Sequence, residues 1–179
     1  MQKKPFHSVA LAFGANLGDA AATISEALGR LQAGGLAEMQ VSDLFKTRPL
    51  GCVPGTPPFL NGAVTGRWPG TPHGLLRLFQ RLDVAAGRPA EHASDQARVL
   101  DLDILLFGHL VLTLPELTLP HPRLGERLFV LAPLAQIAPA WVVPGTGRTV
   151  DELRLREEER FGSADWGHRV AGPPTIGRS

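Results

Sequence analysis

Short apolar runs and longer stretches of helical periodicity alternate along the chain, and together they predict its elements. Between residues 19 and 35, Ile24, Leu28 and Leu31 recur at the spacing of one helix face. A similar periodicity predicts a second helix over 71–87. Four β-rich runs predict strands over 7–14, 39–47, 59–68 and 98–107.

The order strand, helix, strand, strand, helix, strand is typical of an α+β, ferredoxin-like fold, an antiparallel sheet with helices on one face. We expect C-terminal additions after it: a hairpin over 107–116, a short helix over 128–138 and an amphipathic helix over 149–162. We take 1–162 as one domain. Residues 163–179 show no periodicity and are expected to form a disordered tail.

The strand predicted over 98–107 holds two carboxylates, Asp101 and Asp103, within an apolar run. Side chains two apart in a strand point to the same face, and here that face continues with Leu105 and Phe107. One interpretation is that the pair lies on a solvated face of the strand. The other is that the pair binds a cation, because two like charges beside apolar neighbours repel each other unless a cation lies between them. Carboxylate oxygens suit Mg²⁺, which takes its other ligands from water and substrate phosphates. The opposite face is predicted to carry Leu100, Leu102, Ile104 and Leu106.

Groups that could bind phosphate lie around this strand in the sequence. An arginine can contact a phosphate through two nitrogens, although each arginine alone is more typical of a solvated surface. Prolines on both sides of His121 restrict its backbone. The four residues are Arg88, Arg98, His121 and Arg127.

Aromatic and amide groups form a second candidate cluster. Phe59 and Asn61 are two apart and therefore share a strand face, and Phe129 follows Arg127 by two residues. Either both phenylalanines are plain core residues, or they stack on a flat heterocycle whose polar edge the Asn61 amide reads.

Composition narrows the class of protein. The net charge of +1 gives no electrostatic case for a nucleic-acid or membrane-surface partner, and no apolar run could span a bilayer. The N-terminal apolar run reads as a strand and not as a signal peptide. The only cysteine, Cys52, excludes an internal disulfide and a cysteine-based zinc cluster. We expect a cytoplasmic monomer.

Other functions remain possible for such a fold. RNA binding would need exposed aromatic residues and a basic face, and the predicted central strands offer neither. A two-metal nucleotidyltransferase would share the aspartate pair but leaves the segments FLN and PHPRLGERLF without a role. The glycine spacing of FGANLGD does not fit a dinucleotide-binding motif. A non-catalytic nucleotide-binding module is the remaining alternative.

Several segments, taken together and in order, resemble the 6-hydroxymethyl-7,8-dihydropterin pyrophosphokinase family of folate synthesis. They read LAFGANLGD, TRPLG, PPFLNGAV, RVLDLDILLFG and LPHPRLGERLFVLAPLAQIAP. The resemblance covers roughly residues 8 to 155 and implies a ferredoxin-like fold. It also implies transfer of a pyrophosphoryl group from ATP to the hydroxymethyl group of the pterin, with release of AMP.

The resemblance implies roles for individual residues. Two Mg²⁺ ions would be held by Asp101 and Asp103 along the triphosphate of the co-substrate ATP. The implied catalytic set is Arg88, Arg98, Asp101, Asp103, His121 and Arg127. The implied ATP contacts are Gln80, Asp83, Arg88, Arg98, Ile104, His121 and Arg127. The implied pterin pocket is Asn16, Thr47, Arg48, Leu50, Phe59, Asn61 and Phe129.

The sequence departs from the family in the loop over 88–97, which would close over ATP as a lid. Family members often carry an arginine shortly after Gly-Arg, where this chain has Ala90, and a glutamate where it has Asp83. Activity is still expected, because the implied cation ligands and pterin pocket are intact. No residue stands out as a general base.

Overall fold

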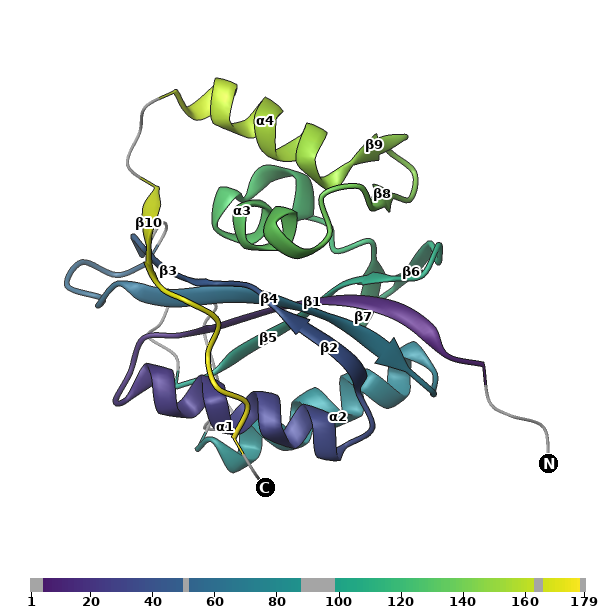
Figure 1. Ribbon diagram of the computed structural model, residues 1–179, viewed down its shortest axis with the longest axis horizontal. Helices are drawn as coiled ribbons and strands as arrows, with labels where there is room; N and C mark the ends of the chain where they lie inside the picture. Colours follow the sequence, from purple (N-terminus) through teal and green to yellow (C-terminus); the bar gives the residue numbers. More distant parts are fainter. Residues whose placement is uncertain (1–4, 50–51, 88–98, 163–165, 178–179) are drawn as a thin grey trace.

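The computed structural model describes residues 5–49, 52–87, 99–162 and 166–177. The described strands build a central antiparallel sheet in the order β10-β3-β4-β1-β5, and β2 also pairs with β4 (Figure 1). The strands of this sheet are β1 (His7–Ala15), β2 (Ala37–Val41), β3 (Leu44–Thr47), β4 (Phe59–Trp68), β5 (Asp101–Phe107) and β10 (Gly167–Ala171).

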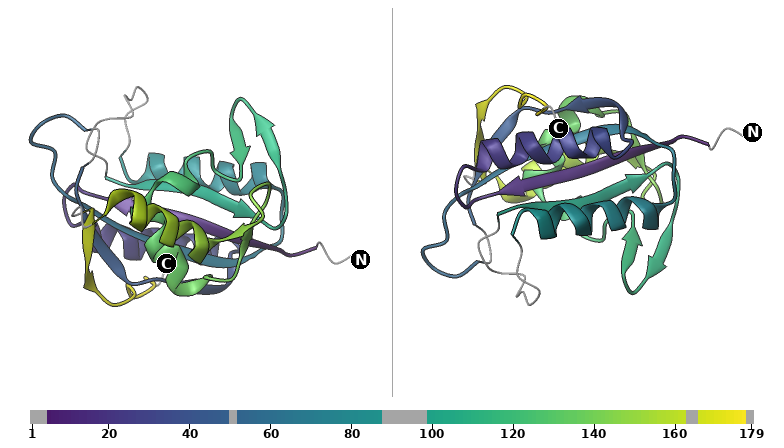
Figure 2. Two further views of the ribbon diagram at one scale, coloured as in Figure 1. Left: turned by 90° about the horizontal axis from the view of Figure 1, so that it is seen from above. Right: turned by 90° about the horizontal axis from the view of Figure 1, so that it is seen from below.

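Helices cover both faces of the sheet (Figures 1 and 2). On one face lie α1 (Ala20–Ala33) and α2 (Pro72–Ala85), and on the other lie α3 (Leu128–Ile137) and α4 (Val150–Phe161). The α+β, ferredoxin-like fold is therefore confirmed, with α3 and α4 as the expected additions. In the described part of the chain, no helix is both long and apolar enough to cross a membrane.

Short elements connect β5 to α3 and α3 to α4. They are the hairpin of β6 (Leu112–Leu114) and β7 (Leu117–Leu119), the 3₁₀ turn η1 (Leu124–Glu126), and the pair β8 (Val142–Val143) and β9 (Arg148–Thr149). The hairpin thus begins and ends later than the predicted 107–116, because its turn lies at Pro115 and Glu116 between two Leu-Thr-Leu runs.

Each helix layer encloses its own hydrophobic core. The core under α1 and α2 includes Ile24, Leu28 and Leu75, whose side chains are 0% exposed. The core under α3 and α4 is smaller and includes Leu131 and Leu134 over the small β-strand residues Ala10, Ala12 and Ala63. The predicted faces of α1 and α2 are thus confirmed.

A bulge in β5 changes which face its last residues meet. Ala10 pairs with Leu106 and Leu11 pairs with Ile104, so Leu105 is an extra residue. Leu105 and Leu106 both join the core under α3 and α4, and Phe107 joins the other core. The predicted faces of Leu106 and Phe107 were therefore wrong, because a one-residue insertion reverses the alternation beyond it.

The run predicted as one strand over 39–47 is divided into β2 and β3. Ser42 stands at the break, where its backbone nitrogen donates to the Ala63 oxygen and its hydroxyl accepts from the Ala63 nitrogen, both at 2.9 Å. β2 and β3 both pair antiparallel with β4, so the run 39–47 is one antiparallel partner of β4 with a break in it.

The described part of the expected disordered tail is ordered instead. Residues 167–171 form β10, which pairs antiparallel with the edge strand β3. A run without hydrophobic periodicity can still form a strand, because backbone pairing to an existing edge requires no buried side-chain face. No pattern in the sequence indicates this pairing.

Candidate active site

The two aspartates stand at the start of β5, on the sheet face that α3 and α4 cover. Asp101 pairs with Gly14 and Asp103 pairs with Ala12 of the central strand β1. Leu102 and Ile104 alternate with them and point into the opposite core. The side chain of Asp103 is 34% exposed, so solvent reaches the pair beside small β1 residues.

His121 approaches this pair from the segment after β7. Its backbone nitrogen donates to the Leu105 oxygen at 2.9 Å, which fixes it against β5, and its Nε2 lies 3.8 Å from Asp103 Oδ2. Burial of the imidazole, followed by the positive charge of Arg127, lowers the pKa of His121 to about 4. The ring is therefore neutral at pH 7, and the contact with Asp103 is not an ion pair.

The tautomer of His121 follows from its second nitrogen. Nδ1 accepts a hydrogen bond from the Arg123 backbone nitrogen at 3.2 Å, so the ring proton is on Nε2. That N–H is on the side of Asp103 and can donate to an anion held there. The Nε2–H group is thus the hydrogen-bond donor of the His121 ring.

Arg127 and Phe129 come from the start of α3. Arg127 occupies the N-cap position, and its guanidinium carbon lies 5.5 Å from the centre of the Phe129 ring, within cation–π range. Phe129 is half-buried against the core under α3 and α4. The start of the helix therefore brings a cation and an aromatic ring to the face that carries the aspartates.

Asn61 lies in the same row of the sheet as Asp101. Asn61 pairs with Gly14, and Gly14 pairs with Asp101, so the row crosses β4, β1 and β5. Two strand spacings separate the outer residues, which puts their Cα atoms about 10 Å apart. A Cβ atom on Gly14 would lie 2.3 Å from Asn61 Oδ1, so glycine is what lets the amide extend over β1.

Thr47 orients this amide. The Asn61 Nδ2 donates to Thr47 Oγ1 at 2.6 Å, and both residues are buried. Thr47 pairs with Phe59, which alternation places on the same face as Asn61. The amide oxygen and the remaining N–H are left to meet a flat polar molecule.

Asn16 and Arg48 border this cluster. Asn16 is buried in the turn after β1, and its Nδ2 donates to the Pro57 oxygen at 3.0 Å, two residues before Phe59. Arg48 follows β3 and its side chain is exposed. The turn after β1 is thereby tied to the segment that leads into β4.

Not every residue implied by the resemblance belongs to this cluster. Gln80 and Asp83 lie on α2, in the opposite helix layer, and the Ile104 side chain is 4% exposed in the core under that layer. The implied residues Leu50, Arg88 and Arg98, and the lid loop over 88–97, lie outside the described residues.

Sequence reasoning did not single out three residues that shape the cluster. Gly14 had a usable signal, since a glycine inside a strand marks a close approach to its neighbours. No sequence signal marks Phe45, which pairs with Asn61. No signal marks Trp166 either, whose ring stacks on Phe45 with 5.8 Å between ring centres. The contact between these two rings depends on the pairing of β10 with β3.

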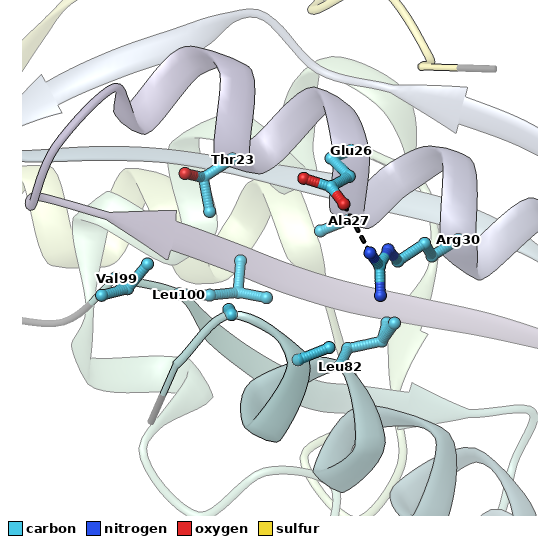
Figure 3. A pocket seen from close by; sticks show the side chains of 9 residues that line it. Thr23, Glu26, Ala27, Arg30, Leu82, Val99 and Leu100 are labelled. Atoms are coloured by element: carbon cyan, nitrogen blue, oxygen red, sulfur yellow. Dashed lines mark hydrogen bonds and ion pairs between the residues drawn. The ribbon is translucent and has the colours of Figure 1, made fainter. Parts of the chain in front are cut away.

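A separate pocket of about 220 Å³ lies between α1 and α2 (Figure 3). Leu82, Leu100 and Ala27 line it, and an ion pair between Glu26 and Arg30 at 2.6 Å crosses its wall. It opens on the sheet face away from the aspartates. The described residues that line it include no pair of acidic side chains, so we do not assign the chemistry to it.

The donor set at β5 fits Mg²⁺. In the ranges that the structure describes, no group of three or more His, Cys, Asp or Glu side chains could hold a metal ion by itself. Two adjacent, partly exposed carboxylates nevertheless suit an ion that keeps waters and takes further oxygens from substrate phosphates. Asp101 and Asp103 would be its protein ligands.

Comparison with known proteins identifies the family of the chain. The model of the 7,8-dihydro-6-hydroxymethylpterin-pyrophosphokinase family matches residues 10–139. A 2-amino-4-hydroxy-6-hydroxymethyldihydropteridine pyrophosphokinase of Bacillus subtilis is 36% identical over 147 residues, covering 82% of this chain and 87% of the relative. The Synechocystis enzyme of the same name is 34% identical over 148 residues, covering 82% of this chain and 74% of its own.

Larger proteins contain a similar part. The chain matches 23% of a mitochondrial folate synthesis bifunctional protein of Arabidopsis thaliana, at 38% identity over 73% of this chain. The crystal structure of Plasmodium falciparum HPPK-DHPS with pteroate has the same fold, with a TM-score of 0.74 and 13% identity over 95% of this chain and 47% of that one. The fold, the order of motifs and the identity to single-function relatives agree, and the chain belongs to the 7,8-dihydro-6-hydroxymethylpterin pyrophosphokinase family.

Proposed function

We propose that this protein transfers the pyrophosphoryl group of ATP to the hydroxymethyl oxygen of 6-hydroxymethyl-7,8-dihydropterin, as a step of folate synthesis. The observation that supports it most is the row of paired residues Asn61, Gly14 and Asp101. It joins an amide that can read a pterin edge to carboxylates that can carry a nucleotide's cation. Both groups lie on one sheet face, with their Cα atoms about 10 Å apart.

In the proposed reaction the hydroxymethyl oxygen attacks the β-phosphorus of ATP. The bond from that phosphorus to the oxygen bridging it to the α-phosphate breaks and AMP leaves. The hydroxyl proton is released to solvent, and the pterin diphosphate forms. Two Mg²⁺ ions on Asp101 and Asp103 would neutralise the phosphate charge. Such a transfer depends mainly on positioning and charge, so little proton chemistry is required of the protein.

The residues of this chain have separate tasks in the proposal. Asn61, held by Thr47, hydrogen-bonds the pterin edge, and Phe59 and Phe129 enclose its ring. The neutral His121 donates its Nε2–H to a phosphate oxygen, and Arg127 supplies a positive charge beside it. Arg88, Arg98, Gln80, Asp83 and the backbone of Ile104 are proposed to complete the nucleotide contacts, and Asn16, Arg48 and Leu50 the rim of the pterin pocket.

We propose a monomeric enzyme that acts in the cytoplasm, where ATP is supplied. Size-exclusion chromatography with light scattering measures the oligomeric state. A dimer would contradict the proposed monomeric state but not the proposed reaction.

The direct test is incubation with Mg-ATP and 6-hydroxymethyl-7,8-dihydropterin, followed by separation of the products. We expect AMP and pterin diphosphate in equal amounts, and no AMP when the pterin is omitted. ADP would instead indicate transfer of a single phosphoryl group, and free pyrophosphate would indicate nucleotidyl transfer. Either product as the main one would contradict the proposal.

A further inference from the structure

The C-terminal segment 166–177, here called the strap, lies beside the candidate pterin pocket although it follows the family-matched region 10–139. Figure 1 shows it in yellow, passing the β3 edge of the sheet from the side of α4 to the side of α1. We propose that the strap is a positioning element for pterin recognition and that Trp166 is its principal residue. This inference rests on the proposed function.

The strap joins the strand that carries Thr47. Gly167 pairs with Thr47, and the Trp166 oxygen accepts a hydrogen bond from the Arg48 backbone nitrogen at 3.3 Å. Thr47 in turn accepts the 2.6 Å hydrogen bond of Asn61. Two consecutive contacts, from Gly167 to Thr47 and from Thr47 to Asn61, therefore connect the strap to the amide proposed to read the pterin.

The Trp166 ring provides a second connection. It stacks on the Phe45 ring with 5.8 Å between ring centres and 25° between planes. Phe45 pairs with Asn61 across β3 and β4, so the two side chains lie on one sheet face. Phe45 is 8% exposed, and the indole covers it next to the row that leads to the aspartates. Trp166 thereby restricts how Phe45, and with it the Asn61 end of the row, can move.

The middle of the strap is fastened beside α3. Arg169 forms an ion pair with Asp43 at the break between β2 and β3. Asp43 also accepts from the Gln136 Nε2 of α3 at 3.1 Å, and its backbone nitrogen donates to Gln136 Oε1 at 3.0 Å. One carboxylate thus joins the strap, the strand break and the helix that begins with Arg127 and Phe129.

The far end of the strap is fastened to α1. The Gly177 nitrogen donates to the Ser25 oxygen at 3.0 Å, and the Ser25 hydroxyl donates to the Thr175 oxygen at 2.5 Å. Ile176 packs against the core under α1 and α2. The strap therefore spans the molecule from one helix layer to the other.

Glycines stand where the strap makes its closest approaches. A Cβ atom on Gly29, inside α1, would lie 2.0 Å from the Gly177 oxygen, and one on Gly167 would lie 2.6 Å from the Lys46 oxygen. A glycine inside a helix is unfavourable by itself relative to alanine. Its presence at Gly29 fits a helix surface that accepts the strap.

The test compares variants of the full chain by steady-state kinetics with each substrate varied in turn. For Trp166→Ala we expect the KM for the pterin to rise about 3- to 10-fold, the range of one lost aromatic stack, with the KM for ATP within about 2-fold. Trp166→Phe keeps a ring on Phe45 and should restore the pterin KM. His168→Ala, two residues further along the strap and with an exposed side chain, is the matched control and should leave both KM values unchanged.

A chain ended after residue 162 should show a larger rise of the pterin KM than Trp166→Ala, and its thermal unfolding reports whether it still folds. An unchanged pterin KM in Trp166→Ala would overturn the inference, as would equal rises in both KM values, which indicate general loss of structure. If the unaltered protein forms no AMP from ATP and the pterin, the proposed function fails first. The two failures are thus distinguishable.

Discussion

The two faces of the central sheet carry different kinds of side chain, although the same strands form both. The face under α1 and α2 is apolar along its length, from Leu100, just before β5, to Trp68 at the end of β4. The face under α3 and α4 is apolar only at one end, where Leu105 and Leu106 pack. At its other end the strands present Asp101, Asp103 and Asn61.

The difference teaches how a small fold separates stability from chemistry. A strand with alternating side chains can supply core residues to one face and polar groups to the other. The polar end of one face can then remain partly exposed, because the opposite core holds the backbone in place. Changes on the two faces should therefore have separable effects.

The largest effect is expected from changing the acid pair. Replacing both Asp101 and Asp103 by Asn keeps size and polarity but removes the negative charges that we propose hold Mg²⁺. We expect turnover to fall by at least about 10³-fold, because cation stabilisation of phosphoryl transfer accounts for several kcal/mol. Thermal unfolding should change little, and turnover near the original rate would show that the carboxylates do not carry the chemistry.

The reverse effect is expected on the opposite face. Leu28→Ala removes a side chain that is 0% exposed in the core under α1 and α2. The free energy of unfolding, measured by urea titration, should fall by about 2–5 kcal/mol. The KM values of the remaining folded protein should stay the same. A selective change of one KM with unaltered stability would mean that the two faces are not independent.

A smaller effect should follow from loss of the Asn61 amide. Asn61→Ala should weaken pterin binding about 5- to 100-fold, as expected for one or two lost hydrogen bonds, and leave ATP binding unchanged. Gly14→Ala should act in the same direction, because its Cβ atom would lie 2.3 Å from Asn61 Oδ1. Calorimetry with each ligand measures both. Unaltered pterin affinity in both variants would remove Asn61 from the site.

The smallest effect concerns the capping box of α4. The backbone N–H and then the hydroxyl of Thr149 donate to Glu152, and these bonds lower the pKa of the Glu152 carboxyl. A lowered folded pKa means that the stabilisation is complete above the ordinary glutamate pKa and is lost as the pH falls through the folded value. Glu152→Gln should lower Tm slightly at pH 7 and reduce the difference in Tm between pH 7 and pH 3. Unchanged pH dependence would show that the cap is not titrating.

Much of the fold was predictable because local patterns and backbone pairing agree in its centre. The strand over 59–68 and the helix caps at Asp19 and Thr71 are set by short-range chemistry. The bulge at Leu105 and the pairing of β10 were not predictable, because each depends on a partner strand far away in the sequence. Such contacts leave no periodicity to read.

The candidate site shows the same limit. The spacing of Asp101 and Asp103 and that of Phe59 and Asn61 gave each pair its common face. Their meeting across Gly14 depends on strand order, which the spacing alone does not contain. The protonation of His121 depends on burial and on Arg127, and could be known only once the surroundings were assembled.

The central claim is that Asp101 and Asp103 hold the cations that carry the phosphates of ATP. The most direct measurement is a crystal structure with a non-hydrolysable ATP analogue and Mn²⁺, with the metal located by anomalous scattering. We expect two metal peaks, each roughly 2.1 Å from a carboxylate oxygen of this pair and in contact with phosphate oxygens. Metal bound to the nucleotide elsewhere, with both carboxylates free of it, would contradict the account.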